Sequence, residues 1–326
     1  MRIMIQAARA AGALLLAAAL APAAGAAYPE QPIKLVMPYP AGGMTDVSGR
    51  TVMAELARKL QGTIVVENKP GAASTVASNW MTQQKPDGYT LYAAPVSLVL
   101  NPLIQGKVGY RPYDSFEPIS MMIESPFVLQ VNKDLPVKSV EELIALIRQR
   151  PDRYAIGTSG VGSINHLAAE YFMSRFGLKM TVVHYKGGGP ASQDLVGNQI
   201  QMMFSAANEA APLVQGGRTR ALAVTTAQRL QLLPQVPTMN EAAGLTDFEA
   251  VFWLALMAPK GLPPDIAQRL SASMRALGDD APLAARLQEL GVSLHVSDGA
   301  AVVRRMREDE AKWGALIQRM DLKPEN

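Results

Sequence analysis

Three glycine-rich turns in this sequence have the composition of small-anion sites. They read PYPAGG at residues 38–43, TSGVGS at 158–163 and YKGGGP at 185–190. Each follows an apolar, strand-like run and precedes a helix-like segment. At such a junction, backbone N–H groups lie at the positive end of a helix dipole, and glycine lets a ligand approach them closely. A carboxylate or another small anion is the ligand that these turns suit.

The first turn is neither GxGxxG nor the GK[ST] ending of a phosphate loop. Alone, it is equally compatible with a tight turn that binds nothing. Three such turns favour a site, because the carboxyl ends of parallel strands face a common crevice. Asp46, in the first turn of the following helix, is expected to satisfy backbone donors or to orient a cationic group or water on the ligand. Ser163 is a natural N-cap, and Thr158 and Ser159 add hydroxyls.

The residues that usually carry catalysis are sparse. The chain has no cysteine, which excludes a thiol nucleophile and thiolate metal ligands. The three histidines, His166, His184 and His295, have no orienting acid at a telling spacing. Neither Ser159 nor Ser163 lies in a GxSxG pattern. We therefore expect no enzyme, and a hydrolase is the remote alternative.

The amino-terminal segment predicts export. Residues 1–27 contain two arginines, a run of alanine and leucine, and a closing Ala-Gly-Ala, which is typical of a signal peptide cleaved near Ala26 or Ala27. A membrane anchor is disfavoured because the apolar run is short and contains Pro22. Removing the two arginines leaves 29 basic against 28 acidic residues, so nothing attracts nucleic acid.

Strand-like and helix-like segments alternate along the mature chain, which predicts an α/β fold with mainly parallel sheets. The predicted strands include residues 33–37, 63–67, 90–94, 155–158, 181–185 and 200–204, of which 33–37, 155–158 and 181–185 lead into the three turns. Two longer β-like runs, 117–131 and 248–257, are predicted to cross between two lobes as a hinge. On this interpretation lobe one comprises 28–125 plus 258–326, and lobe two comprises 126–257.

The last predicted helix covers residues 299–320. Its charged run from Arg304 to Glu310 is expected on a solvated face, and Trp253 is expected on the second crossing strand.

Seven stretches, in this order and spacing, resemble one protein family. They are YPEQPIKLVMPYPAGGMTD, VENKPGAAS, KPDGYTL, TSGVGSINHLAAE, VHYKGGGPASQDLVGNQI, RALAVTTAQRLQLLPQVPTMNEAAG and FWLALMAPKGLPPDI. Over essentially the whole mature chain, the sequence is similar to the extracytoplasmic solute-binding receptors of the tripartite tricarboxylate transporter family, also called Bug or TctC-like proteins.

The resemblance implies a two-lobed periplasmic-binding-protein (Venus flytrap) fold with no metal or organic cofactor. It implies a carboxylate ligand held by the first strand–helix loop and the lobe-two turns, partly through waters. The expected ligand-binding residues are Tyr39, Ala41, Gly42, Gly43, Met44, Asp46, Thr158, Ser159, Gly160, Gly162, Ser163, His166, Gly187, Gly188, Gly189 and Ser205.

Ser205 departs from the family pattern, because many members carry an aspartate facing the cleft at this position. Its replacement favours a plain mono- or dicarboxylate, or an aromatic acid, over an amino acid. The resemblance further implies a periplasmic monomer with a small organic acid as ligand and membrane permease subunits as partners. A ligand sensor that docks on a membrane kinase would have the same fold, and the sequence does not separate the two.

Overall fold

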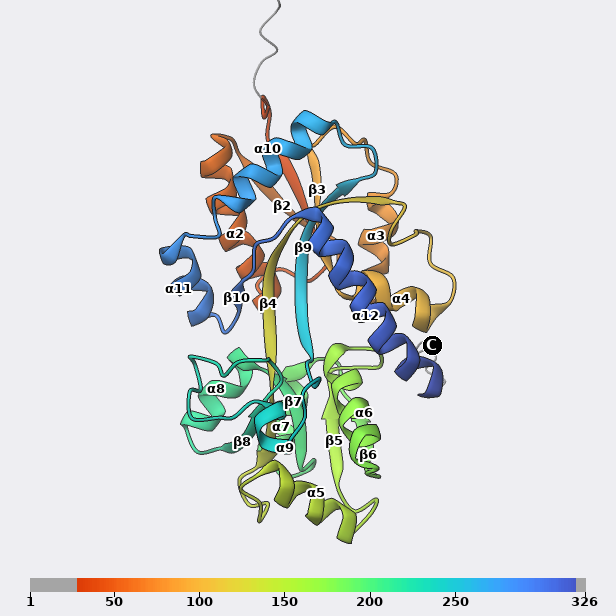
Figure 1. Cartoon of the computed structure of the whole chain (residues 1–326), viewed down its shortest axis with the longest axis vertical. Coiled ribbons are helices and arrows are strands. Elements are labelled where there is room, and N and C mark those ends of the chain that lie inside the picture. Colours follow the sequence, from red (N-terminus) through yellow and green to blue (C-terminus); the bar gives the residue numbers. More distant parts are fainter. Residues whose placement is uncertain (1–27, 321–326) are drawn as a thin grey trace, which may run out of the picture.

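The computed structural model describes residues 28–320 (Figure 1). The predicted signal peptide and its cleavage site lie outside these residues. Within them, no helix combines the length and the apolar character of a membrane span.

Three parallel strands form the centre of the upper lobe in Figure 1. β1 (Ile33–Met37) lies between β2 (Ile64–Asn68) and β3 (Thr90–Pro95). β1 is almost entirely apolar because helices cover its sheet. A helix follows each strand: α2 (Met44–Leu60), then η1 (Ala72–Ser74) with α3 (Thr75–Met81), then α4 (Ser97–Gln105). The carboxyl ends of the three strands therefore share one edge.

The lower lobe repeats this plan. β5 (Ala155–Thr158) lies between the parallel strands β6 (Thr181–His184) and β7 (Met202–Ala206). The other elements of this lobe are α5 (Val140–Gln149), α6 (Ile164–Phe176), α7 (Gly188–Val196), α8 (Ala207–Gln215), β8 (Thr219–Val224) and α9 (Met239–Ala243).

Two long strands run between the lobes (Figure 1). β4 (Phe116–Asn132) and β9 (Val251–Pro259) pair antiparallel, and β4 continues into the lower lobe to pair with β7 and β8. The mixed sheet thus consists of two parallel triplets joined by antiparallel crossing strands. The lobe boundaries given above stay a proposal. The chain ends with α10 (Pro264–Arg275), α11 (Ala281–Glu289), β10 (Ser293–Leu294) and α12 (Gly299–Met320).

α12 fastens the two crossing strands to each other. Its Arg305 lies 3.5 Å from Glu124 of β4 and 2.9 Å from Glu249, just before β9. Arg305 also donates to Asp309 at 3.0 Å. We call Glu124, Glu249, Arg305 and Asp309 the hinge network.

Asp309 is 5% exposed and accepts the indole N–H groups of Trp253 at 2.7 Å and Trp313 at 3.2 Å. The expectation of a solvated charged face was wrong for part of this run. Positions 305, 309 and 313 follow one another at one-turn spacing, and this stripe faces the crossing strands.

The hinge network gives stability a dependence on pH through His295, whose Nδ1 lies 3.3 Å from Glu124 Oε2. The hydrogen bond to Glu124 raises the pKa of His295 above its ordinary 6.5. Burial works to raise the pKa of Glu124, but the hydrogen bond and charge of His295, with the charge of Arg305, hold it below its ordinary 4.5. The interaction between His295 and Glu124 therefore contributes fully to the stability of the fold between pH 4.5 and pH 6.5, the ordinary pKa values of the two groups.

We expect His295→Gln to lower the free energy of unfolding by up to about 1 kcal/mol near pH 5.5, because the imidazole is half-exposed. The loss shrinks as the pH rises through the folded pKa of His295. It also shrinks as the pH falls through that of Glu124. Urea unfolding at pH 5.5 and pH 8.5 measures the difference, and an equal loss at both would contradict the role of charge.

Candidate ligand-binding site

The first glycine turn leaves the N-terminus of α2 uncapped. Gly43 is the N-cap residue, and no side chain accepts a hydrogen bond there. Among the described residues, the N–H groups of Gly43, Met44 and Thr45 have no hydrogen-bond acceptor. Ala41, Gly42 and Gly43 are exposed. The positive end of a helix of 17 residues therefore faces outward.

The two glycines of this turn are required for different reasons. Gly42 has φ +83°, a conformation that favours glycine. Gly43 has φ −73° and ψ 164°, which any residue adopts. A Cβ at Gly43 would come no closer than 3.7 Å to the carbonyl oxygen of Pro40. Since the fold does not demand glycine at position 43, the open backbone there is suited to close approach by a ligand.

Asp46 organises this turn from within. Its carboxylate is 2% exposed and accepts from Gly42 N–H at 3.0 Å, Arg50 Nε at 2.9 Å and Asn68 Nδ2 at 2.8 Å. Burial opposes ionisation, but these hydrogen bonds and the charge of Arg50 hold the pKa of Asp46 below its ordinary value. Of the two expected roles, the geometry supports the first: Asp46 satisfies a backbone donor.

A second loop of the same lobe was not singled out from the sequence. After β2, Ala72, Ala73 and Ser74 have φ values of 44°, 49° and 78°, and such strained backbone is common at functional sites. Ser74 is buried, and its Oγ lies 2.8 Å from Oγ of Ser97, which follows β3. The signal was present, because KPGAAST also follows a strand and precedes a helix.

Tyr39 adds a further hydroxyl to this edge. Its ring packs edge-on against Phe252 of β9, with centroids 5.8 Å apart. Burial raises the pKa of Tyr39 to about 12, and a hydrogen bond with Ser97 opposes this only in part. The phenol therefore stays protonated and can donate a hydrogen bond.

The second turn is held rigidly by its own side chains. Ser163 caps α6 through the N–H of His166, as predicted. Ser159 Oγ donates to Asn165 Oδ1 at 2.9 Å, and Gly162 N–H donates to His166 Nδ1 at 3.0 Å.

A pair of histidines, the buried His166 and the exposed His184, lies behind the second turn. The ring of His166 packs edge-on against His184, with centroids 4.6 Å apart, and Thr158 Oγ1 lies 2.8 Å from His184 Nδ1. His166 itself is 2% exposed. In this arrangement His166 and Thr158 shape the turn and do not lie open at its surface.

The third turn leaves a second helix uncapped. Gly187 is the N-cap residue of α7, no side chain caps it, and Gly189 is exposed. Among the described residues, the N–H groups of Gly188 and Gly189 have no acceptor. Pro190, which lacks an N–H, is the third helical residue.

The second turn adjoins both the third turn and the upper lobe. A Cβ at Gly160 would lie 3.6 Å from the carbonyl oxygen of Tyr185. A Cβ at Gly162 would lie 2.8 Å from Ile104 of α4, so turn two touches the upper lobe. Ser205 is not at this surface: it is 1% exposed and accepts from Gln130 Nε2 at 2.6 Å. In residues 28–320, no group of three or more acids and histidines is arranged to hold a metal.

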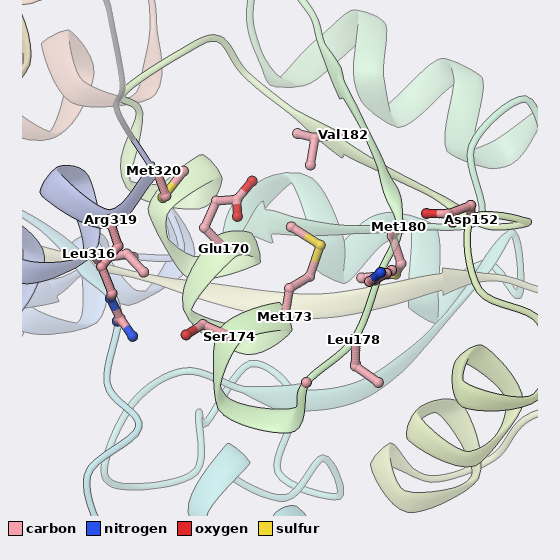
Figure 2. A pocket seen from close by; sticks show the side chains of 12 residues that line it. Asp152, Glu170, Met173, Ser174, Leu178, Met180, Val182, Leu316, Arg319 and Met320 are labelled. Carbon is pink, nitrogen blue, oxygen red and sulfur yellow. The ribbon is translucent and has the colours of Figure 1, made fainter.

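A separate pocket of about 580 Å³ lies beside α6, β6 and the end of α12 (Figure 2). Met173, Met180 and Met320 contribute to its apolar lining, with Glu170 and Arg319 also at its wall. None of the predicted ligand-binding residues lines this pocket.

Comparison with known proteins decides the family. Residues 49–322 match the family described as Tripartite tricarboxylate transporter family receptor. The chain belongs to this family. It is 34% identical to Protein BugT of Bordetella pertussis over 250 residues, which is 76% of either protein. It is 31% identical to a protein encoded in the ttuE-ttuC' intergenic region of Agrobacterium vitis, over 94% of this chain and 90% of the relative.

Two solved structures share the fold of this chain. A Rhodopseudomonas palustris protein solved with adipate is 31% identical, with a TM-score of 0.80, and the match covers 91% of this chain and all of that one. MatC of Rhodopseudomonas palustris, solved with bound malate, is 28% identical, with a TM-score of 0.73, over 89% of this chain and all of the other.

The family and its structural neighbours are periplasmic solute-binding proteins, not enzymes. The predicted periplasmic-binding-protein fold and family are confirmed. The hydrolase alternative is set aside.

Proposed function

We propose that this receptor captures a small carboxylic acid in the periplasm and presents it to the membrane permease subunits of a tripartite tricarboxylate-type transporter. The observation that carries the proposal is the uncapped N-terminus of α2, where Gly43 is exposed without any need of the fold for glycine. The neighbours solved with adipate and malate support a carboxylate as the ligand class.

In the proposed mechanism, the carboxylate first accepts hydrogen bonds from the N–H groups of Gly43, Met44 and Thr45. The lower lobe then closes with turns two and three, bending the crossing strands β4 and β9. Each charge-assisted hydrogen bond contributes about 1.5–3 kcal/mol. The ligand drives closure only through its stronger binding to the closed state, and we propose that the permease recognises that state.

The remaining parts of the proposal follow from the sequence. The chain is exported by residues 1–27, cleaved near Ala26 or Ala27, and acts as a monomer without a cofactor. The predicted ligand is a mono- or dicarboxylate, or an aromatic acid.

A thermal-shift screen of the mature, ligand-stripped protein tests this function. The panel contains mono-, di- and tricarboxylates, aromatic acids and amino acids, with matched amides as controls. An acid at 100 times its dissociation constant adds about 2.7 kcal/mol, which raises the melting temperature by a few degrees. Stabilisation by acids and not by their amides is the expected result. Stabilisation by no acid would refute carboxylate capture.

A further inference from the structure

Glu209 is a carboxylate without a partner beside the third glycine turn. It lies in the first turn of α8 and is half-buried. Its Oε2 occupies the space where a Cβ at Gly188 would lie, so the carboxylate packs directly on the α7 N-terminus. No hydrogen bond or ion pair within the described residues engages Glu209.

The same helix end reaches the upper lobe. Asn208 precedes Glu209, and a Cβ at Gly291, after α11, would lie 2.7 Å from the backbone nitrogen of Asn208. The Oδ1 of Asn208 is buried without a hydrogen-bond partner among the described residues. Glu209 therefore lies beside a glycine turn of the proposed site, and the residue before it takes part in a contact between the lobes.

The two helix ends of this site differ in whether the nearby acid is paired with a cation. At the α2 end, the nearby acid, Asp46, is buried and paired with Arg50. Its negative charge is therefore compensated and does not repel an anion bound at the free N–H groups of this helix. At the α7 end, the carboxylate of Glu209 lies against Gly188, the first residue of the helix, and makes no hydrogen bond with its N–H group. Burial raises the pKa of Glu209, and a ligand anion there would raise it further. A second ligand carboxylate is thus disfavoured at this end, whereas a hydrogen-bond donor is favoured.

We propose that Glu209 is a specificity-determining residue, and that the receptor selects a small carboxylic acid whose second polar group is a hydrogen-bond donor, preferably an ammonium group. The ligand carboxylate lies at α2, and the donor points to Glu209. This inference rests on the proposed function. It differs from the expectation drawn from Ser205, because Ser205 is buried, whereas Glu209, four residues later, supplies a carboxylate beside the third turn.

The test uses pairs of acids of matched length that differ in the second group. The probes are succinate, glutarate and adipate against β-alanine, 4-aminobutanoate and 5-aminopentanoate, with L-glutamine and L-glutamate as a branched pair. Isothermal titration compares wild type, Glu209→Gln and Glu209→Ala. Glu141→Gln, an exposed acid of α5 in the same lobe, is the matched control. Melting temperatures of the ligand-free variants verify folding.

We expect the best amino acid to bind wild type at least about 10-fold more tightly than its dicarboxylate partner, a ratio that typical charge-assisted hydrogen bonds supply. Glu209→Gln should remove this preference, chiefly by weakening the amino acid, and Glu141→Gln should keep it. Preference for a dicarboxylate in wild type, or an unchanged ratio in both Glu209 variants, would overturn this inference alone. Binding of no acid at all would overturn the proposed function and this inference with it.

Discussion

Gly43→Val is expected to lower the affinity for the captured acid by about 100-fold or more, the equivalent of one or two charge-assisted hydrogen bonds. The valine side chain would cover the N–H groups of residues 43–45 that the carboxylate needs. The fold should persist, because the φ of −73° suits any residue and the nearest atom to the new Cβ is 3.7 Å away. Isothermal titration measures the affinity.

Gly197→Val is the matched control for this variant. Gly197 ends α7, has φ −76°, and a Cβ there would meet the Gln193 carbonyl oxygen at 3.4 Å. It belongs to none of the three turns. Both variants should melt close to wild type, and only Gly43→Val should lose binding. An affinity unchanged within about threefold in Gly43→Val would remove the α2 N-terminus from the site.

Asp309→Ala is expected to lower the free energy of unfolding by about 3–5 kcal/mol, the usual result of removing one partner of a buried charge pair. Three donors depend on this carboxylate: the guanidinium of Arg305 and the indoles of Trp253 and Trp313. Because Trp253 belongs to β9, the substitution weakens the contact between α12 and one of the two strands that connect the lobes. Urea unfolding followed by tryptophan fluorescence measures it.

Two substitutions calibrate this result. Asp309→Asn keeps the shape and one acceptor oxygen, so it should destabilise less than alanine does. Arg304→Ala changes an exposed residue on the same helix and should stay within about 0.5 kcal/mol of wild type. If Asp309→Ala also lies within about 1 kcal/mol of wild type, the hinge network does not hold the crossing strands together.

Regular elements with strong local patterns were predicted well from the sequence. The strand at residues 33–37 and the helix at 299–320 have the predicted bounds. The crossing strands were predicted as 117–131 and 248–257 and are found at Phe116–Asn132 and Val251–Pro259. Their length and apolar composition made them visible, because a strand buried on both faces reads as one continuous apolar run.

Interactions between distant segments could not be predicted in this way. Asp46 was placed in the correct helical turn, but its partner Asn68 lies on another strand. The charges of Arg305 and Asp309 read as a solvated face because their partners Glu124, Glu249 and Trp253 are about 50 or more residues away in the chain. The local spacing of a helix does not say which tertiary surface it faces.

Among the candidate site residues, the sequence predicted where the glycine turns lie, but it did not predict what each side chain around them contacts. Uncapped glycines at α2 and α7 follow from composition alone. Ser205 was expected at the ligand, whereas it is buried against Gln130. Glu209 carries no motif, and only the packing of α8 on Gly188 brings it to the third turn.

The most direct measurement is a crystal structure of the mature protein with the acid that binds best in the screen. We predict that a ligand carboxylate lies within about 3 Å of the backbone nitrogens of Gly43, Met44 and Thr45, with turns two and three closed over it. A carboxylate bound elsewhere, for example in the pocket of Figure 2, with the α2 N-terminus facing only solvent, would contradict the account.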